Sequence, residues 1–302
     1  MSSIFSKVLT FFVLIGVGYV IRRIRLVEES FSKALSVFVL YIALPALVIN
    51  SMQFQFSPEM FSNSVILLIA GGVLYAMLWL IGITASRFLC LSGSSRAVFL
   101  YASLLGNVAY LGYPVVELVL GREGVFYAAV FNVWFNVLTW TTGIRIMTGG
   151  KKGAPARALL NPGTISIMIG FLIFVFSIPL PSFLDESLSL LGESTIPLAM
   201  VVVGVTLAGV NTRKMAADRR VLLYSLLKLV LAPCIVMLIL RLFDLQPIVE
   251  NILIIMSAMP AAANTSIFAR LYDSDYEFAS KLIAVSTLFS LISIPVIISL
   301  ID

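Results

Sequence analysis

The chain has 302 residues and a formal net charge of +5; 60% of its residues are hydrophobic and only 12% are charged. Soluble domains carry about 25% charged residues, so this composition excludes an ordinary soluble protein and indicates an integral membrane protein. No histidine is present, which excludes histidine metal ligands and serine–histidine–aspartate catalysis, so we expect no enzyme, no metal site and no cofactor. The basic residues lie in short loops rather than in one patch, so no nucleic-acid partner is expected.

The apolar segments predict an all-α membrane protein, because they are close to twenty residues long rather than the ~10 of a barrel strand. Ten such segments follow one another: Ile4–Ile21, Lys33–Met52, Ser64–Ser86, Ser95–Leu120, Gly124–Met147, Pro162–Leu180, Ser187–Val210, Arg220–Phe243, Val249–Arg270 and Glu277–Ile301. Sixteen of the 20 lysines and arginines lie in the connections after odd-numbered segments or near the segment ends that border them. The positive-inside rule then places those loops in the cytoplasm and both termini outside, in a plasma (inner) membrane.

The fourth and ninth segments carry residues that interrupt helices. Asn107, Gly112 and Pro114 lie near the middle of the fourth segment, and Pro260 and Asn264 lie near the middle of the ninth. Proline lacks an N–H and its ring clashes with the preceding turn, so a continuous helix is disfavoured. An interrupted helix survives in hydrocarbon only where it faces protein or a water-filled cavity. Two such breaks in corresponding places predict a transporter's binding site, where broken helices 4 and 9 cross.

A polar linker at 148–160 divides the chain into two halves of five segments each, 1–147 and 161–302. An odd number of spans in each half turns the second half upside down relative to the first. Corresponding features support this relation, since Asn107 and Asn264 both lie in the fourth segment of their half. The sequence therefore predicts two inverted five-helix repeats.

Each break creates helix ends that suit an anion. If the two segments cross, the N-termini of the second half-helices carry roughly +0.5 charge each, together with free N–H groups. The first half-helices present C-terminal carbonyls, which could hold Na⁺ instead. Asn107 and Asn264 could bind a carboxylate, or could satisfy backbone groups that the break frees. Thr265 could add a hydroxyl or bond its own backbone, and Tyr110 joins the substrate-binding candidates although packing is its more common role.

Two further polar positions lie within predicted spans. Asn136 shares a helix face with Asn132 and Thr139, which predicts either a polar cavity wall or hydrogen bonds between helices. Lys228 is the one basic residue deep in a span, and an ionisable residue there is a functional candidate. It could attract an anion, or hold a fixed positive charge where a coupling cation would otherwise sit. Alternatively, it snorkels to the cytoplasmic interface.

Short motifs stand in order along the chain: Gly106-Asn107, Gly112-Tyr113-Pro114, Asn161-Pro162 and Ile196-Pro197-Leu198-Ala199. With the ten spans, they resemble the auxin efflux carrier family, which includes plant PIN carriers and bacterial malate and malonate permeases. The resemblance covers nearly the whole chain and implies a fold similar to bile-acid sodium symporters. It implies a scaffold from helices 1, 2, 6 and 7, a transport domain from helices 3–5 and 8–10, and a homodimer through the scaffold. It also implies elevator-type motion, with Gly112, Pro114 and Pro260 at the helix crossover.

These features predict a secondary active transporter of a small organic anion, such as malate, malonate or an auxin-like acid. The alternatives are a passive anion channel and a sodium-coupled symporter of another small solute. Coupling to Na⁺ or H⁺ stays open. An intramembrane enzyme lacks support, because the chain has no histidine and no deep pair of aspartates.

Overall fold

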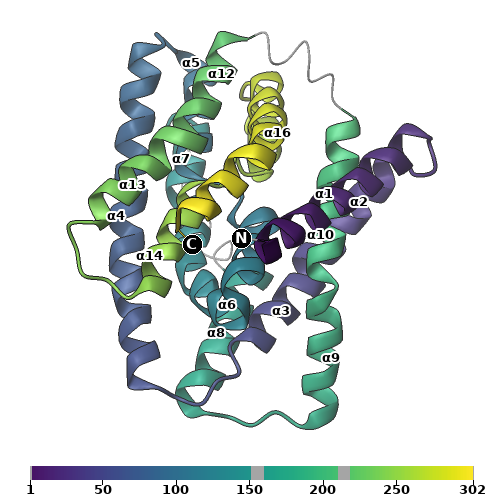
Figure 1. The fold of residues 1–302 in the computed structure, drawn as a ribbon. Coiled ribbons are helices and arrows are strands. Elements are labelled where there is room, and N and C mark those ends of the chain that lie inside the picture. Colours follow the sequence, from purple (N-terminus) through teal and green to yellow (C-terminus); the bar gives the residue numbers. More distant parts are fainter. Residues whose placement is uncertain (1, 151–159, 210–217, 302) are drawn as a thin grey trace. The chain divides into compact units, whose positions relative to one another are not determined.

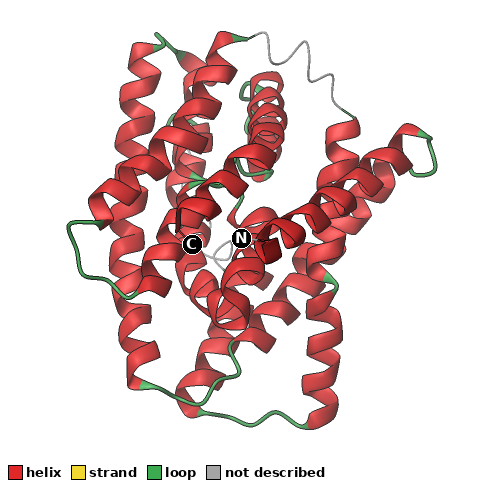
Figure 2. Ribbon diagram, viewed as in Figure 1, coloured by secondary structure: helices red, strands yellow, loops and turns green. Residues whose placement is uncertain are grey.

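The structure, a computed structural model, describes residues 2–150, 160–209 and 218–301. The regular elements of these residues are all helices (Figure 2). Five continuous helices are long and apolar enough to cross a membrane: Ser30–Ser51, Pro58–Phe88, Ser182–Ala208, Arg219–Leu240 and Tyr276–Ile301. Two shorter helices, Pro162–Phe176 and Pro247–Ser257, are also apolar. The all-helical fold is confirmed, whereas ten spans in two inverted repeats stay a prediction. Most of the predicted linker, residues 151–159, lies outside the described residues.

The chain forms two compact units, and each unit gathers stretches that are separate in the sequence. The first unit comprises 1–67, 109–133 and 160–210, and the second comprises 68–108, 134–159 and 211–302. Figure 1 labels the helices in chain order. Two helices, α4 (Pro58–Phe88) and α6 (Tyr113–Leu138), contribute residues to both units.

The first unit contains the following helices: α1 (Ser2–Arg23), α2 (Glu29–Phe38), α3 (Leu44–Ser51), α8 (Pro162–Phe176), α9 (Ser182–Glu193) and α10 (Thr195–Ala208). α1 packs closely against α10. A Cβ on Gly18 would overlap the Val201 carbonyl oxygen, and a Cβ on Gly204 would overlap the Ile15 carbonyl oxygen. Small residues that let two backbones approach are typical of helix contacts in membranes, so these glycines explain the α1–α10 contact.

The second unit contains the following helices: α5 (Gly93–Leu104), α7 (Ile144–Met147), α12 (Arg219–Leu226), α13 (Ala232–Leu240), α14 (Pro247–Ser257), α15 (Asn264–Leu271) and α16 (Tyr276–Ile301). α16 packs against α5, α12 and α15. At its start, the Asp275 side chain accepts a bond from the Phe278 N–H (3.0 Å) and another from the Ser95 hydroxyl (2.6 Å). Asp275 therefore caps α16 and ties it to the start of α5.

α6 is two helical stretches rather than one. Gly121, with φ 65° and ψ −158°, is non-helical inside it, and only glycine adopts that conformation readily. The interruption falls between the fourth and fifth predicted spans, where the sequence places a turn.

Three of the π-helical turns in the described chain precede a proline in the same way. They cover Val39–Ala43, Val108–Gly112 and Leu227–Leu231, and the prolines Pro45, Pro114 and Pro233 are each the second residue of the helix that follows. A proline ring clashes with the carbonyl four residues earlier, which lies inside each of these turns. The wider π-helical turn is a known response to such strain.

Candidate functional site

The two interrupted segments meet where their helical hydrogen bonds stop. α5 ends at Leu104, and the next residue, Leu105, is extended with φ −108° and ψ 106°. Non-helical residues likewise separate α14 from α15. Gly106 of the first segment and Ala261 of the second form an isolated antiparallel bridge. A Cβ on Gly106 would lie only 3.1 Å from the Met259 carbonyl oxygen, so glycine suits this close approach.

Backbone groups released by the two breaks are paired across this bridge. The Asn107 N–H donates to the Pro260 carbonyl oxygen (2.7 Å), and the Ala262 N–H donates to the Leu105 carbonyl oxygen (3.2 Å). An unpaired backbone group costs several kcal/mol in an apolar interior. Mutual pairing therefore explains how both helices can be interrupted at buried positions.

α16 supplies another hydrogen bond at the same place. The Ala261 N–H donates to Ser286 Oγ (3.1 Å), and the Ser286 hydroxyl donates to the Leu282 carbonyl oxygen (2.6 Å). Ser286 is 0% exposed. Sequence reasoning missed this residue, because no spacing or motif distinguishes it from the other serines of its apolar helix.

The two candidate asparagines lie where the helical residues begin again after each break. Asn107 directly precedes the π-helical turn that leads into α6, and Asn264 is the first residue of α15. Asn107 is 7% exposed. Thr265 is fully buried, and its hydroxyl has no hydrogen-bond partner among the residues that the structure describes. Buried hydroxyls are usually paired, so the unpaired Thr265 Oγ1 distinguishes the start of α15.

Three other candidates lie after the crossing stretch of the first segment. Gly112 ends the π-helical turn, and Pro114 lies in the first turn of α6. Tyr110 is buried, and its hydroxyl donates to the Ser36 carbonyl oxygen (3.0 Å), which is a packing contact with α2. Of the crossover candidates, Pro260 is therefore the one whose backbone takes part in the pairing.

The polar face of α6 divides into two parts. Asn132 Nδ2 donates to the Tyr113 hydroxyl (3.1 Å), which is a side-chain bond within the first unit. Asn136 is buried in the part of α6 that belongs to the second unit. The structure thus gives Asn132 a hydrogen-bonding role and places Asn136 in the same unit as the paired breaks.

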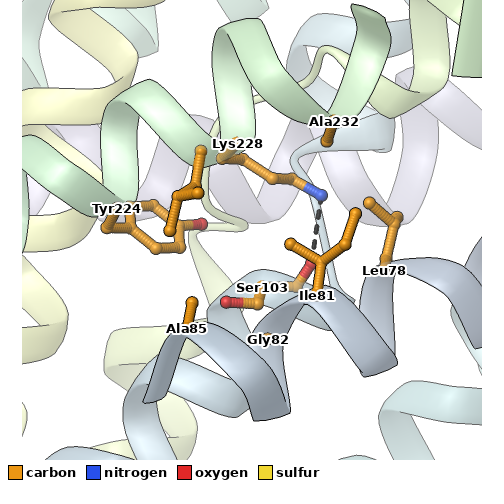
Figure 3. A pocket seen from close by; sticks show the side chains of 9 residues that line it. Leu78, Ile81, Gly82, Ala85, Ser103, Tyr224, Lys228 and Ala232 are labelled. Carbon is orange, nitrogen blue, oxygen red and sulfur yellow. Dashed lines mark hydrogen bonds between the residues drawn. The ribbon is translucent and has the colours of Figure 1, made fainter. Parts of the chain in front are cut away.

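Lys228 lies inside the second unit rather than at its surface. Its side chain is 3% exposed, and Nζ donates to the carbonyl oxygen of Ser103 (3.2 Å), in the last turn of α5. Figure 3 shows the ammonium pointing to this carbonyl. Nearby, the Tyr224 hydroxyl donates to the Ala102 carbonyl oxygen (2.9 Å). Sequence reasoning missed Tyr224, although its position four residues before Lys228 puts both side chains on one helix face.

A helical protein with several membrane-length apolar helices and two interrupted helices paired at their breaks belongs to the class of multi-pass membrane transporters. Comparison with known proteins is more specific. Residues 3–158 and 151–298 match the family described as membrane transport protein. The chain belongs to this family, which includes the auxin efflux carriers.

Curated relatives cover almost the whole chain. One is an uncharacterized transporter of Methanocaldococcus jannaschii, 26% identical over 95% of this chain and 95% of its own. Another, from Rhizobium meliloti, is provisionally named a malonate transporter and is 27% identical over 97% of this chain and 94% of its own. The uncharacterized transporter YfdV of Escherichia coli is 20% identical over 96% of this chain and 95% of its own length. These relatives identify a transporter rather than an enzyme.

Proposed function

We propose that the protein is a secondary active transporter of small organic carboxylates, and that the paired breaks form its substrate site. The observation that carries the proposal is the backbone pairing of Leu105–Asn107 with Pro260–Ala262. This pairing joins the two breaks and gives partners to the Asn107 and Ala262 N–H groups. Asn107, Asn264 and Thr265 lie in or directly after the paired stretches.

The chemistry of these side chains suits a carboxylate. Asparagine amides donate hydrogen bonds without adding a buried charge, and the Thr265 hydroxyl is buried without a partner in the described part of the chain. The second half-helices begin directly after the breaks, and a helix N-terminus favours an anion. A relative provisionally named a malonate transporter also supports a small dicarboxylate as substrate.

The mechanism that we propose is an elevator-type exchange between two faces of the membrane. Helices 1, 2, 6 and 7 would form a scaffold that joins two subunits, and helices 3–5 and 8–10 would carry the substrate. The gathering of 1–67 with 160–210, and of 68–108 with 211–302, into separate compact units supports this division. The distribution of basic residues supports a plasma-membrane topology with both termini outside.

Uptake into proteoliposomes tests the proposal. The purified protein is offered labelled malonate, malate, monocarboxylates and indole acids, and unlabelled substrate is then placed on the opposite side. We expect saturable uptake of at least one carboxylate and faster uptake against unlabelled substrate, because a carrier exchanges one bound molecule for another. Carboxylate flux without such stimulation would indicate a channel, and transport of an uncharged solute alone would contradict the anion site.

Variants at the breaks then locate the site. A hydrogen bond to a charged group contributes about 1.5–3 kcal/mol, so Asn107→Ala and Asn264→Ala should each raise the substrate concentration for half-maximal uptake about 10- to 100-fold. Asn63→Ala is the matched control, since Asn63 is a buried asparagine of the first unit that donates to the Tyr127 hydroxyl (3.5 Å), whereas the paired breaks belong to the second unit. Normal uptake by both break variants would show that the site is elsewhere.

A further inference from the structure

The first unit contains a stretch, 109–133, that lies in the sequence between two parts of the second unit, 68–108 and 134–159. This stretch includes the end of the fourth predicted span, the start of the fifth and the connection between them. In the proposed mechanism, helices 3–5 belong to the part that moves, whereas helices 1, 2, 6 and 7 form the scaffold. The contacts of 109–133 with the scaffold helices α2, α3 and α8 therefore join a moving part to a fixed one.

The stretch 109–133, here called the α6 hairpin, has a buried hydrogen bond of its own. Gly121, with φ 65°, turns the chain near its middle. Asn132 Nδ2 donates to the Tyr113 hydroxyl (3.1 Å), and these two residues are 4% and 0% exposed. This bond connects the helical stretches on either side of Gly121, so the two arms of the hairpin are joined to each other as well as to the scaffold.

Arg122, directly after the turn, docks the hairpin on α3. Its Nη2 donates to the Asn50 carbonyl oxygen (2.5 Å) and to the Gln53 carbonyl oxygen (3.4 Å). Its guanidinium also lies over the Phe54 ring, 5.4 Å from the ring centroid. α3 ends at Ser51, and a helix C-terminus attracts a cation because its last carbonyls carry partial negative charge. Arg122 is therefore a cationic cap that the hairpin provides for a scaffold helix.

Two further contacts attach the hairpin to the scaffold helices. The Phe126 ring packs edge-on against Phe174 of α8 (4.9 Å between centroids), and Phe126 is 0% exposed. The Tyr110 hydroxyl donates to the Ser36 carbonyl oxygen of α2 (3.0 Å). Arg122 differs from both, because it is exposed. Exposed polar contacts compete with water and contribute little net stability, so the Arg122 contact is the one that opens most easily.

We propose that Arg122 is a releasable latch, which holds the α6 hairpin on α3 in this conformation and opens in each transport cycle. This inference rests on the proposed function and adds a positioning residue for its conformational step. The partners of the guanidinium are backbone carbonyls and an aromatic ring rather than a buried carboxylate. Opening the contact therefore leaves no unpaired buried charge, and water can bond to the separated groups.

A latch of this kind has a consequence for substrate binding. Bonds that form only in the latched conformation raise its population relative to the conformation that opens to the other face of the membrane. The apparent affinity at each face equals the intrinsic affinity multiplied by the population of the conformation open there. Loss of the latch therefore strengthens apparent binding at one face and not at the other, which general damage to the fold does not do.

A reversible crosslink tests whether the contact opens. Cys90 and Cys234 are first replaced by serine, and cysteines are then introduced as Gln55→Cys and Glu123→Cys, at exposed positions beside the contact. A short bifunctional methanethiosulfonate joins the two cysteines, and a reductant removes it. Initial uptake into proteoliposomes is measured for the carboxylate of the panel above that the uncrosslinked protein takes up fastest.

A second crosslink serves as the control. It joins Glu186→Cys to Leu190→Cys, two exposed positions one turn apart on α9. We expect the crosslink beside Arg122 to lower uptake about tenfold or more, because a carrier that cannot change conformation does not turn over. We expect the reductant to restore uptake and the α9 crosslink to leave it unchanged. Unchanged uptake with the hairpin crosslinked to α3 would overturn the inference, because it would show a permanent joint.

Variants of Arg122 give a second test. Half-saturating concentrations are measured at both faces, by uptake and efflux in proteoliposomes of known orientation. We expect Arg122→Met to lower this concentration about 2- to 10-fold at one face without lowering it at the other, and Arg122→Lys to lie between Arg122→Met and wild type. Arg241→Met is the control, since Arg241 is an exposed arginine of the second unit, and it should match wild type. Unchanged values in Arg122→Met, or a rise at both faces, would overturn the inference.

Hydrogen exchange decides the same question without transport. Exchange of the segment 119–128 is compared in both crosslinked proteins and in their reduced forms. We expect the crosslink beside Arg122 to slow exchange about twofold or more, because it prevents local opening, and the α9 crosslink to have no effect. Identical exchange with and without the crosslink beside Arg122 would overturn the inference. If wild type takes up no carboxylate, the proposed function fails, while this measurement still shows whether the hairpin separates from α3.

Discussion

Ser286→Ala tests whether the buried pairing of the two breaks needs the hydroxyl of α16. The substitution removes the oxygen that accepts the Ala261 N–H at 3.1 Å. Both residues are 0% exposed, so water does not readily replace the lost bond. A buried donor left without a partner costs about 1–3 kcal/mol, and we expect the pairing to weaken by this amount.

Ser290→Ala isolates that effect from a general serine effect. Ser290 lies one turn later on α16, is also 0% exposed, and donates within its own helix to the Thr287 carbonyl oxygen (2.7 Å). Ser286 makes the same kind of bond to Leu282 and in addition accepts from Ala261. The difference between the two variants is therefore the contribution of the bond to the break.

Hydrogen exchange of the segment 258–263 gives a local readout that does not require two-state unfolding. A loss of 1–3 kcal/mol corresponds to about 5- to 150-fold faster exchange. We expect this acceleration in Ser286→Ala and little change in Ser290→Ala. Equal exchange in the two variants would refute the reasoning that Ser286 holds the break together.

Two further predictions concern stability. Gly204→Ala should lower the free energy of unfolding by about 1–3 kcal/mol, because the added Cβ would overlap the Ile15 carbonyl oxygen. Gly16→Ala is the control, since no atom lies within 4 Å of its added Cβ. Equal melting temperatures of the two variants would contradict the α1–α10 contact. Asp218→Ala should lower the free energy of unfolding by about 1 kcal/mol, because the Asp218 side chain caps α12 by accepting a bond from the Arg220 N–H (3.0 Å). The Arg220 side chain, which bonds the Asp218 carboxylate, holds the pKa of Asp218 below its usual value. This stabilisation is present above the usual pKa of about 4 and is lost as the pH falls further. The difference in unfolding free energy between wild type and Asp218→Ala should therefore be larger at pH 7 than at pH 3. A difference that does not change with pH would contradict the charged cap.

The prolines and glycines of the sequence predict the positions of the two helix breaks, but only approximately. The sequence centres the first break between Asn107 and Pro114, whereas the non-helical residues are Leu105–Asn107. Pro114 lies inside the helical run that begins at Val108 and does not end the helix. Its strain appears instead as the preceding π-helical turn.

Pairing between distant residues could not be predicted in the same way. The bridge between Gly106 and Ala261 depends on how the second unit packs, and neither residue has a local pattern that names its partner. Lys228 shows the same limit, because its long side chain permits both a surface position and an internal one. The packing of α4 and α5 around its ammonium gives the internal position.

Ligand-dependent hydrogen exchange tests the central claim, that the paired breaks bind the substrate, most directly. Exchange is measured with and without a carboxylate that the proteoliposomes take up, in segments 104–110 and 258–266 and in the control segment 182–193 of α9. We predict that the carboxylate slows exchange in both break segments and leaves α9 unchanged. Protection confined to other helices, with none at either break, would contradict the account.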